Sequence, residues 1–100
     1  MARNPMGPLA IELEVLREKA FALQTTGRKM ERLIDELKAV EQALAPLSGI
    51  DRWPLVKRHS ELRAALQEER WKMMVQREAL GLTRHDDLDD IYPIPRRITE

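Results

Sequence analysis

The sequence predicts an all-α protein: a long antiparallel helical hairpin, followed by a short C-terminal helix and an extended tail. Apolar residues repeat at helical spacing over residues 9–45 and again over residues 53–80. The segment between these stretches holds Pro46, Gly49 and Asp51, which favour turns. Because a short connection makes two helices antiparallel neighbours, the 100 residues are expected to form a single helical domain.

The first helix, predicted for residues 9–45, carries an uninterrupted heptad repeat. We call its apolar members the seam and predict that they form the core and the dimer contact: Leu9, Leu13, Leu16, Leu23, Met30, Ile34, Leu37 and Leu44. A second stripe lies about 120° away and contains Ile11, Val15, Ala22, Leu33 and Val40. Two stripes require two neighbours. Gly27 occupies a seam position. It predicts close helix packing there in preference to a hinge in the helix, because the heptad phase continues through it.

The second helix is predicted for residues 53–80. Asp51 is its expected N-cap residue, and Gly81 suits the left-handed conformation that ends many helices. One face carries Leu55, Leu62, Leu66, Met73 and Leu80, whereas Trp71, Val75 and Leu82 lie nearly opposite. The second half of this helix is therefore apolar on two sides, and the second side needs a further neighbour.

The C-terminal segment is expected to supply that neighbour. A short helix is predicted for residues 84–92, and Pro93 and Pro95 then force an extended tail. The predicted docking contact consists of Trp71, Val75, Leu82, Leu88, Ile91, Tyr92 and Ile94. Two alternatives stay open: the tail docks on another chain, or it is a free peptide that recruits a partner.

The oligomeric state follows from the thin core of a hairpin. Two helices alone leave more apolar surface than soluble monomers usually expose. A homodimer that forms a four-helix bundle is the simplest way to bury this surface. A higher oligomer, or a tail that covers the gap, is the alternative.

Composition excludes several classes of function. Seventeen basic and seventeen acidic residues give a formal net charge of zero, so no long-range field favours nucleic acid or an acidic partner. The lack of cysteine excludes disulfides, thiolate metal sites and cysteine nucleophiles. The first residues have no apolar stretch typical of a signal peptide, and no run approaches ~20 apolar residues. A soluble cytoplasmic protein without membrane contact is expected.

Two polar segments are interpreted as structural, so that no catalytic, cofactor or metal site is expected. Gln76, Arg77 and Glu78 are consecutive on a helix, and their side chains cannot converge on one small ligand. His85 and Asp89 have the i, i+4 spacing of metal ligands. One histidine with surface carboxylates is nevertheless a weak donor set, and acidic residues are favoured at a helix start by the macrodipole.

The turn between the helices is a possible nucleic-acid contact. It groups Arg52, Trp53, Lys57 and Arg58, and cations beside an exposed tryptophan can bind single strands by charge and stacking. The alternative is a solvated turn with Trp53 folded onto the end of the bundle. We favour this alternative, because the zero net charge gives no domain-wide basic face.

The chain also resembles an uncharacterised domain-of-unknown-function family of short bacterial helical proteins. The matching positions are Glu18, Lys19, Ala20, Gly27, Arg28, Gln76, Arg77, Glu78, Gly81, Leu82, His85, Tyr92, Ile94 and Pro95. The similarity covers both helices and the tail but not the central turn, and the chain has Pro93 where the family has glycine. The resemblance implies a helical fold and no particular activity.

The most favoured function is therefore non-catalytic: a small scaffold, adaptor or regulatory module that binds other proteins. The alternative is a weak nucleic-acid-binding module that uses the basic turn, and a metal-dependent enzyme ranks third. Neither the protein partner nor the pathway follows from the sequence.

Overall fold

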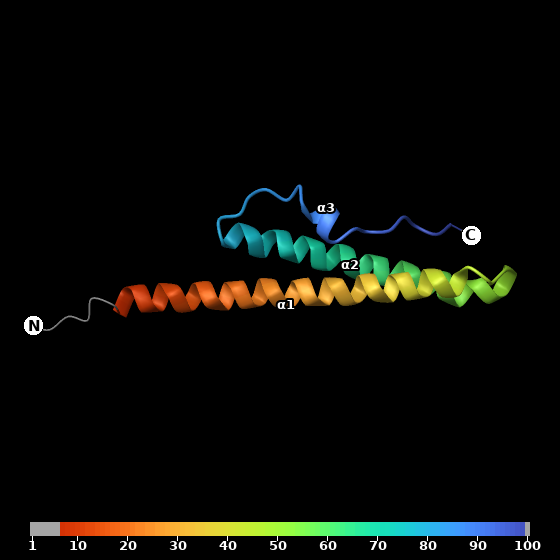
Figure 1. The fold of residues 1–100 in the computed structure, drawn as a ribbon, viewed down its shortest axis with the longest axis horizontal. Helices are drawn as coiled ribbons and strands as arrows, with labels where there is room; N and C mark the ends of the chain where they lie inside the picture. Colours follow the sequence, from red (N-terminus) through yellow and green to blue (C-terminus); the bar gives the residue numbers. More distant parts are fainter. Residues whose placement is uncertain (1–6, 100) are drawn as a thin grey trace, which may run out of the picture.

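A computed structural model of the protein describes the backbone of residues 7–99 and the side chains of residues 9–99. It contains α1 (Gly7–Leu44), a 3₁₀ helix η1 (Gly49–Arg52), α2 (Trp53–Ala79) and α3 (Leu88–Ile91), with no strand in the described residues. The two long helices pack side by side and antiparallel (Figure 1). The predicted all-α hairpin is confirmed. None of the helices described is both long and apolar enough to cross a membrane.

The two long helices differ in length, and this difference shapes the molecule. α1 has 38 residues and α2 has 27, which correspond to about 57 Å and about 40 Å. α2 ends beside Lys19, whose Nζ donates to the carbonyl oxygen of Ala79 over 3.3 Å. The first part of α1 therefore extends beyond the end of α2 (Figure 1). We call residues 9–18 the overhang.

The turn is closed by a side chain and not by the predicted cap. Arg52 donates from one guanidinium nitrogen to the carbonyl oxygens of Leu44 (2.7 Å) and Leu47 (3.1 Å), which satisfies the end of α1. Asp51 lies inside η1, and Arg52, with helical dihedral angles, directly precedes α2. The prediction of Asp51 as N-cap is wrong, because the 3₁₀ helix runs straight into α2 and leaves no extended capping position.

The end of α2 follows the predicted glycine. Gly81 has a φ of 86°, in the left-handed region. The N–H of Gly81 donates to the backbone carbonyl oxygen of Glu78, and the N–H of Leu82 donates to that of Arg77, both over 2.9 Å. These two bonds form a Schellman motif, which reverses the chain at the end of the helix.

The third helix is shorter than predicted. Only Leu88–Ile91 are helical, whereas the sequence predicts a helix over residues 84–92. Side chains on both sides of the Schellman turn hold the preceding segment: Arg77 pairs with Asp87 and Glu78 with His85. Residues 82–85 must cross from the end of α2 back to the core, and an extended chain spans this distance in fewer residues than a helix.

The core lies between three layers: α1, α2 and the C-terminal segment. Its fully buried members include Met30 and Leu37 from α1, Leu66 from α2 and Leu88 from α3. Tyr92 and Ile94 pack against this cluster. The C-terminal segment therefore docks on its own chain, and α1 gains a second neighbour along part of its length.

Gly27 is a point of close packing, as predicted. α1 continues through it, and the residue is buried. A Cβ atom at this position would lie 2.8 Å from Oη of Tyr92 and 3.4 Å from Cε of Met73. Gly27 is thus the place where the tail and α2 both approach the backbone of α1.

Candidate functional site

The overhang exposes the first part of the seam. Leu9, Leu13 and Leu16 are 45%, 44% and 47% exposed, whereas Leu37, which shares the heptad position of Leu9 and Leu16, is 1% exposed. The difference arises because α2 covers α1 only from about Lys19 onwards. The seam therefore splits into a covered part, from Leu23 to Leu44, and a part with no neighbour in the described chain.

The second stripe of α1 divides at the same place. Leu33 is buried because it belongs to the core cluster, and Val40 is half-buried because it packs against that cluster. Ile11 and Val15 are exposed on the overhang, and Phe21 is exposed beside its end. A helix that is apolar on two faces and exposed on both is typical of an interaction surface.

Charged residues border the exposed seam. At 100° per residue, Glu12 and Lys19 lie on one flank of the seam and Arg17 lies on the other. Lys19 uses one of its three N–H donors on Ala79, and its side chain lies at the boundary between overhang and hairpin. The flank with Glu12 and Lys19 thus carries both signs of charge at a spacing of two helical turns.

The predicted docking contact is only partly formed. Leu88, Tyr92 and Ile94 pack on the core, but Trp71 is 68% exposed, and Val75, Leu82 and Ile91 are also exposed. The prediction that the tail covers Trp71 and Val75 is therefore wrong. The tail instead follows the flank of α2 that adjoins α1, because there Leu88 and Tyr92 reach the core and Gly27 at the same time.

Three arginines hold the C-terminal segment on that flank. Nε of Arg63 donates to the carbonyl oxygen of Pro95 (2.8 Å), Arg70 bonds Asp89 (2.8 Å), and Arg77 makes two bonds to Asp87 (2.7 and 3.1 Å). Arg63, Arg70 and Arg77 are spaced by seven residues, so they project from one face of α2. This heptad spacing of cations is the sequence signal for the path of the tail, and the apolar pattern alone does not reveal it.

The pair of Arg77 and Asp87 perturbs both groups. The hydrogen bond from Arg77 is the main cause that lowers the pKa of Asp87, and the same bond raises the pKa of Arg77. Arg77 is nearly buried while Asp87 is half-exposed, so the guanidinium is the anchored partner. This geometry fits a structural clamp for the segment before α3.

The acidic segment before α3 is engaged in pairs within the chain. Nε2 of His85 lies 3.1 Å from Oε1 of Glu78, and Asp86 pairs with Arg84 over 2.8 Å. Asp89, the predicted metal partner of His85, is bound by Arg70. Within residues 7–99, no three histidine, aspartate or glutamate side chains converge as metal ligands.

The basic turn is also partly engaged. Arg52 binds the end of α1, and Arg58 pairs with Glu36 over 3.3 Å. Trp53 is 64% exposed, so the favoured interpretation, in which it folds onto the end of the bundle, is wrong. The ammonium of Lys57 lies 5.7 Å from the centre of its ring, which is a cation–π contact. Trp53 and Lys57 are exposed, and Arg58 is also exposed although it pairs with Glu36.

Comparison with known proteins adds no relative. No protein-family model, curated protein or solved structure matches the chain. The resemblance to a family of short bacterial helical proteins therefore stays a prediction.

Proposed function

We propose that the protein is a non-catalytic interaction module that acts as a homodimer joined through its overhangs. The supporting observation is the exposure of Leu9, Leu13 and Leu16, since they continue a seam that is buried elsewhere in α1. A second copy of the same helix is a suitable occupant, because its overhang needs the same cover. The role as scaffold, adaptor or regulatory subunit, and the cytoplasmic location, stay predictions.

The hairpin restricts how two overhangs can pair. A parallel pairing would place the second α1 along the seam beyond Lys19, where α2 already lies. An antiparallel pairing avoids this overlap, because the second helix arrives from the opposite end and stops near the end of α2. We therefore propose an antiparallel register in which Leu13 faces Leu16 of the second copy, and Leu9 faces its Ala20.

Charge supports the same register. In an antiparallel pair related by a two-fold axis, a flank of one helix faces the same flank of the other. Glu12 would then lie near Lys19 of the second copy, and this pairing would occur twice. Each such exposed pair contributes only about 0.2–1 kcal/mol, so the charges select the register while the leucines provide most of the affinity.

This end-to-end dimer differs from the four-helix bundle predicted from the sequence. A bundle would have to use the side of α2 that carries Trp71 and Val75, both exposed. The overhang presents three exposed leucines on one face, Leu9, Leu13 and Leu16, and exposes Ile11 and Val15 on the second stripe. We favour the overhang for this reason.

Sedimentation at micromolar concentration tests the dimer. The wild-type protein is expected to sediment at about twice its mass of 11.6 kDa, and Leu13→Glu to sediment as a monomer. Ile50→Glu is the matched control, because Ile50 is 87% exposed at the opposite end of the hairpin. A wild-type monomer, or a dimer that Leu13→Glu leaves intact, would contradict the proposal.

Cysteine pairing tests the register, since the chain has no cysteine of its own. Mixing Leu13→Cys with Leu16→Cys under mild oxidation should favour the mixed disulfide dimer over either homodimer. Preferred Leu13→Cys homodimers would indicate a parallel pair. Preferred cross-links at Trp71→Cys would indicate the four-helix bundle.

A weak nucleic-acid-binding function is the second candidate. It is supported by the exposed ring of Trp53 with Lys57 above it. If this function holds, an RNA or DNA mobility shift should weaken with salt and be lost in Trp53→Ala. No shift at low salt would exclude it.

A further inference from the structure

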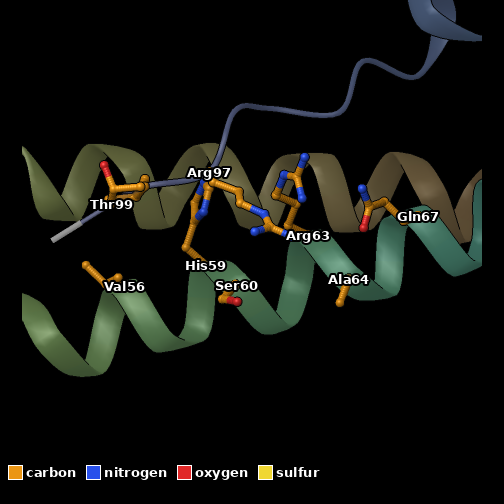
Figure 2. A pocket seen from close by; sticks show the side chains of 9 residues that line it. Val56, His59, Ser60, Arg63, Ala64, Gln67, Arg97 and Thr99 are labelled. Carbon is orange, nitrogen blue, oxygen red and sulfur yellow. The ribbon is translucent and has the colours of Figure 1, made fainter.

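A cavity of about 390 Å³ lies between α2 and the C-terminal tail. Its polar lining residues are His59, Ser60, Arg63, Gln67, Arg97 and Thr99. Figure 2 shows the side chain of Arg97 extending from the tail toward Arg63 on α2. Two guanidinium groups therefore come from separate parts of the chain to one cavity.

Arg63 is held in place for binding. Its Nε donates to the carbonyl oxygen of Pro95 over 2.8 Å, and the side chain is half-buried. A guanidinium has five N–H donors in a rigid plane, so the four on its terminal nitrogens stay available beyond this contact. The bond to Pro95 also positions the tail residue Arg97, two residues further on.

The charge of the cavity favours an anion. Among the described residues that line it, none is a carboxylate, and Arg97 makes no ion pair within the described chain. Glu41 is the carboxylate next to the lining residue His59, with Oε1 3.0 Å from Nε2 of that ring. One oxygen of this carboxylate thus contacts His59, and the described lining itself supplies no counter-charge to the two neighbouring cations.

We propose that this cavity binds the oxyanion of a small organic molecule, a phosphate or a carboxylate, between Arg63 and Arg97. Guanidinium groups bind both anions with paired hydrogen bonds. The hydroxyls of Ser60 and Thr99 supply further donors at the edge, and Val56, Ala64 and Ile98 give an apolar wall for the rest of the molecule. The volume lies within the range of about 300–1,000 Å³ that is usual for such sites.

Binding at this place would tie the tail to α2. Arg63 belongs to the helix and Arg97 to the tail, so an oxyanion between them adds a link beside the bond to Pro95. Anion binding here does not require the dimer, because the residues that line the cavity belong to α2 and the tail and none belongs to the overhang.

Titration calorimetry with three simple probes tests the site. Phenyl phosphate and benzoate carry the two oxyanions on the same ring, and phenol carries no charge. We expect at least one anion to bind and phenol not to bind. Arg97→Gln should weaken anion binding by at least about tenfold, since a hydrogen bond to a charged group is lost.

Arg96→Gln is the matched control, because Arg96 is an exposed cation of the same tail that does not line the cavity. It should leave anion binding nearly unchanged. Arg97→Gln is preferred to Arg63→Gln, whose loss also removes the bond to Pro95, and its thermal unfolding without ligand should match the wild type. Absence of binding by both anions, equal binding of phenol, or equal loss in Arg96→Gln would overturn the proposal.

Discussion

The two halves of α1 have the same heptad pattern and opposite environments. From Leu23 to Leu44 the seam packs against α2, and Leu33 shares the core cluster with Leu88 of the C-terminal segment. On the overhang, Leu9, Leu13 and Leu16 are almost half exposed. A heptad repeat predicts that a helix packs against a neighbour on one face, but it does not identify that neighbour. On the overhang, none of the described residues supplies that neighbour.

Removing the C-terminal segment should turn part of the covered half into a second exposed region. Deleting residues 82–100 removes the buried Leu88 and the packed Tyr92 and Ile94. Since each buried large apolar side chain contributes about 1.5–3 kcal/mol, we expect the largest loss of stability here. Thermal unfolding measures it, and a stability equal to that of the full chain would contradict the docked tail.

Trp71 provides a second measurement on the truncated chain. It is already 68% exposed in the full chain, so truncation should barely change its accessibility to a soluble quencher. A Trp53→Phe background isolates its fluorescence. A strong rise in quenching would mean that the tail covers Trp71 after all.

Matched leucine substitutions compare the two halves directly. Leu37→Ala should cost about 2–5 kcal/mol in the free energy of unfolding, because the side chain is fully buried. Leu13→Ala should change the free energy of unfolding by no more than about 0.5 kcal/mol under dilute, monomeric conditions. Urea unfolding at low and high protein concentration measures both, and the cost of Leu13→Ala should grow with concentration if the overhang pairs.

Gly27→Ala examines the covered half at its tightest point. Alanine favours a helix over glycine by about 1 kcal/mol, but its Cβ would lie 2.8 Å from Oη of Tyr92. We expect the substitution to destabilise the wild type and to stabilise a Tyr92→Phe background, which lacks this oxygen. Equal effects in the two backgrounds, compared in a double-mutant cycle, would disprove the close contact.

Acid should weaken the covered half through two carboxylates. Burial alone would raise the pKa of Glu69, but hydrogen bonds and charges from Lys29 and Lys72 outweigh it and lower the pKa; Arg77 lowers that of Asp87. A lowered folded-state pKa means that this stability is present above the unfolded-state values. It decreases as pH falls below the unfolded-state values, 4.5 for Glu69 and 3.8 for Asp87, and is lost once pH passes below the lowered folded-state values. The unfolding midpoint of Glu69→Gln should therefore depend less on pH than that of the wild type.

The sequence predicted the features that depend on local pattern. Both long helices end within about two residues of the predicted bounds, as is usual for periodic segments. Gly81 and Gly27 have the predicted roles, because each depends on a backbone requirement that few other residues satisfy. The seam was predicted as one continuous core and dimer contact; its covered part lies in the core, whereas the dimer contact stays a prediction.

Features that depend on spatial register were not predictable in the same way. The point where α2 ends against α1 depends on the geometry of the turn, which Arg52 closes through the backbone of Leu44 and Leu47. The path of the tail depends on Arg63 and Arg70, whose seven-residue spacing resembles an ordinary solvated face. The apolar character of Trp71 predicts that the tail covers this side chain. In the structure, core contacts and ion pairs instead hold the tail on the flank of α2 that adjoins α1.

The turn closed by Arg52 also implies an order of local opening along the hairpin. Contacts near the turn join residues close in sequence, such as His59 with Glu41, 18 positions apart, whereas Lys19 and Ala79 are 60 apart. Closing the longer loop costs about 1 kcal/mol more in chain entropy. Backbone amides at the end of α2 should therefore exchange with solvent deuterium faster than those beside the turn. The hairpin would open from the overhang inward, and a partner bound to the overhang would slow that exchange.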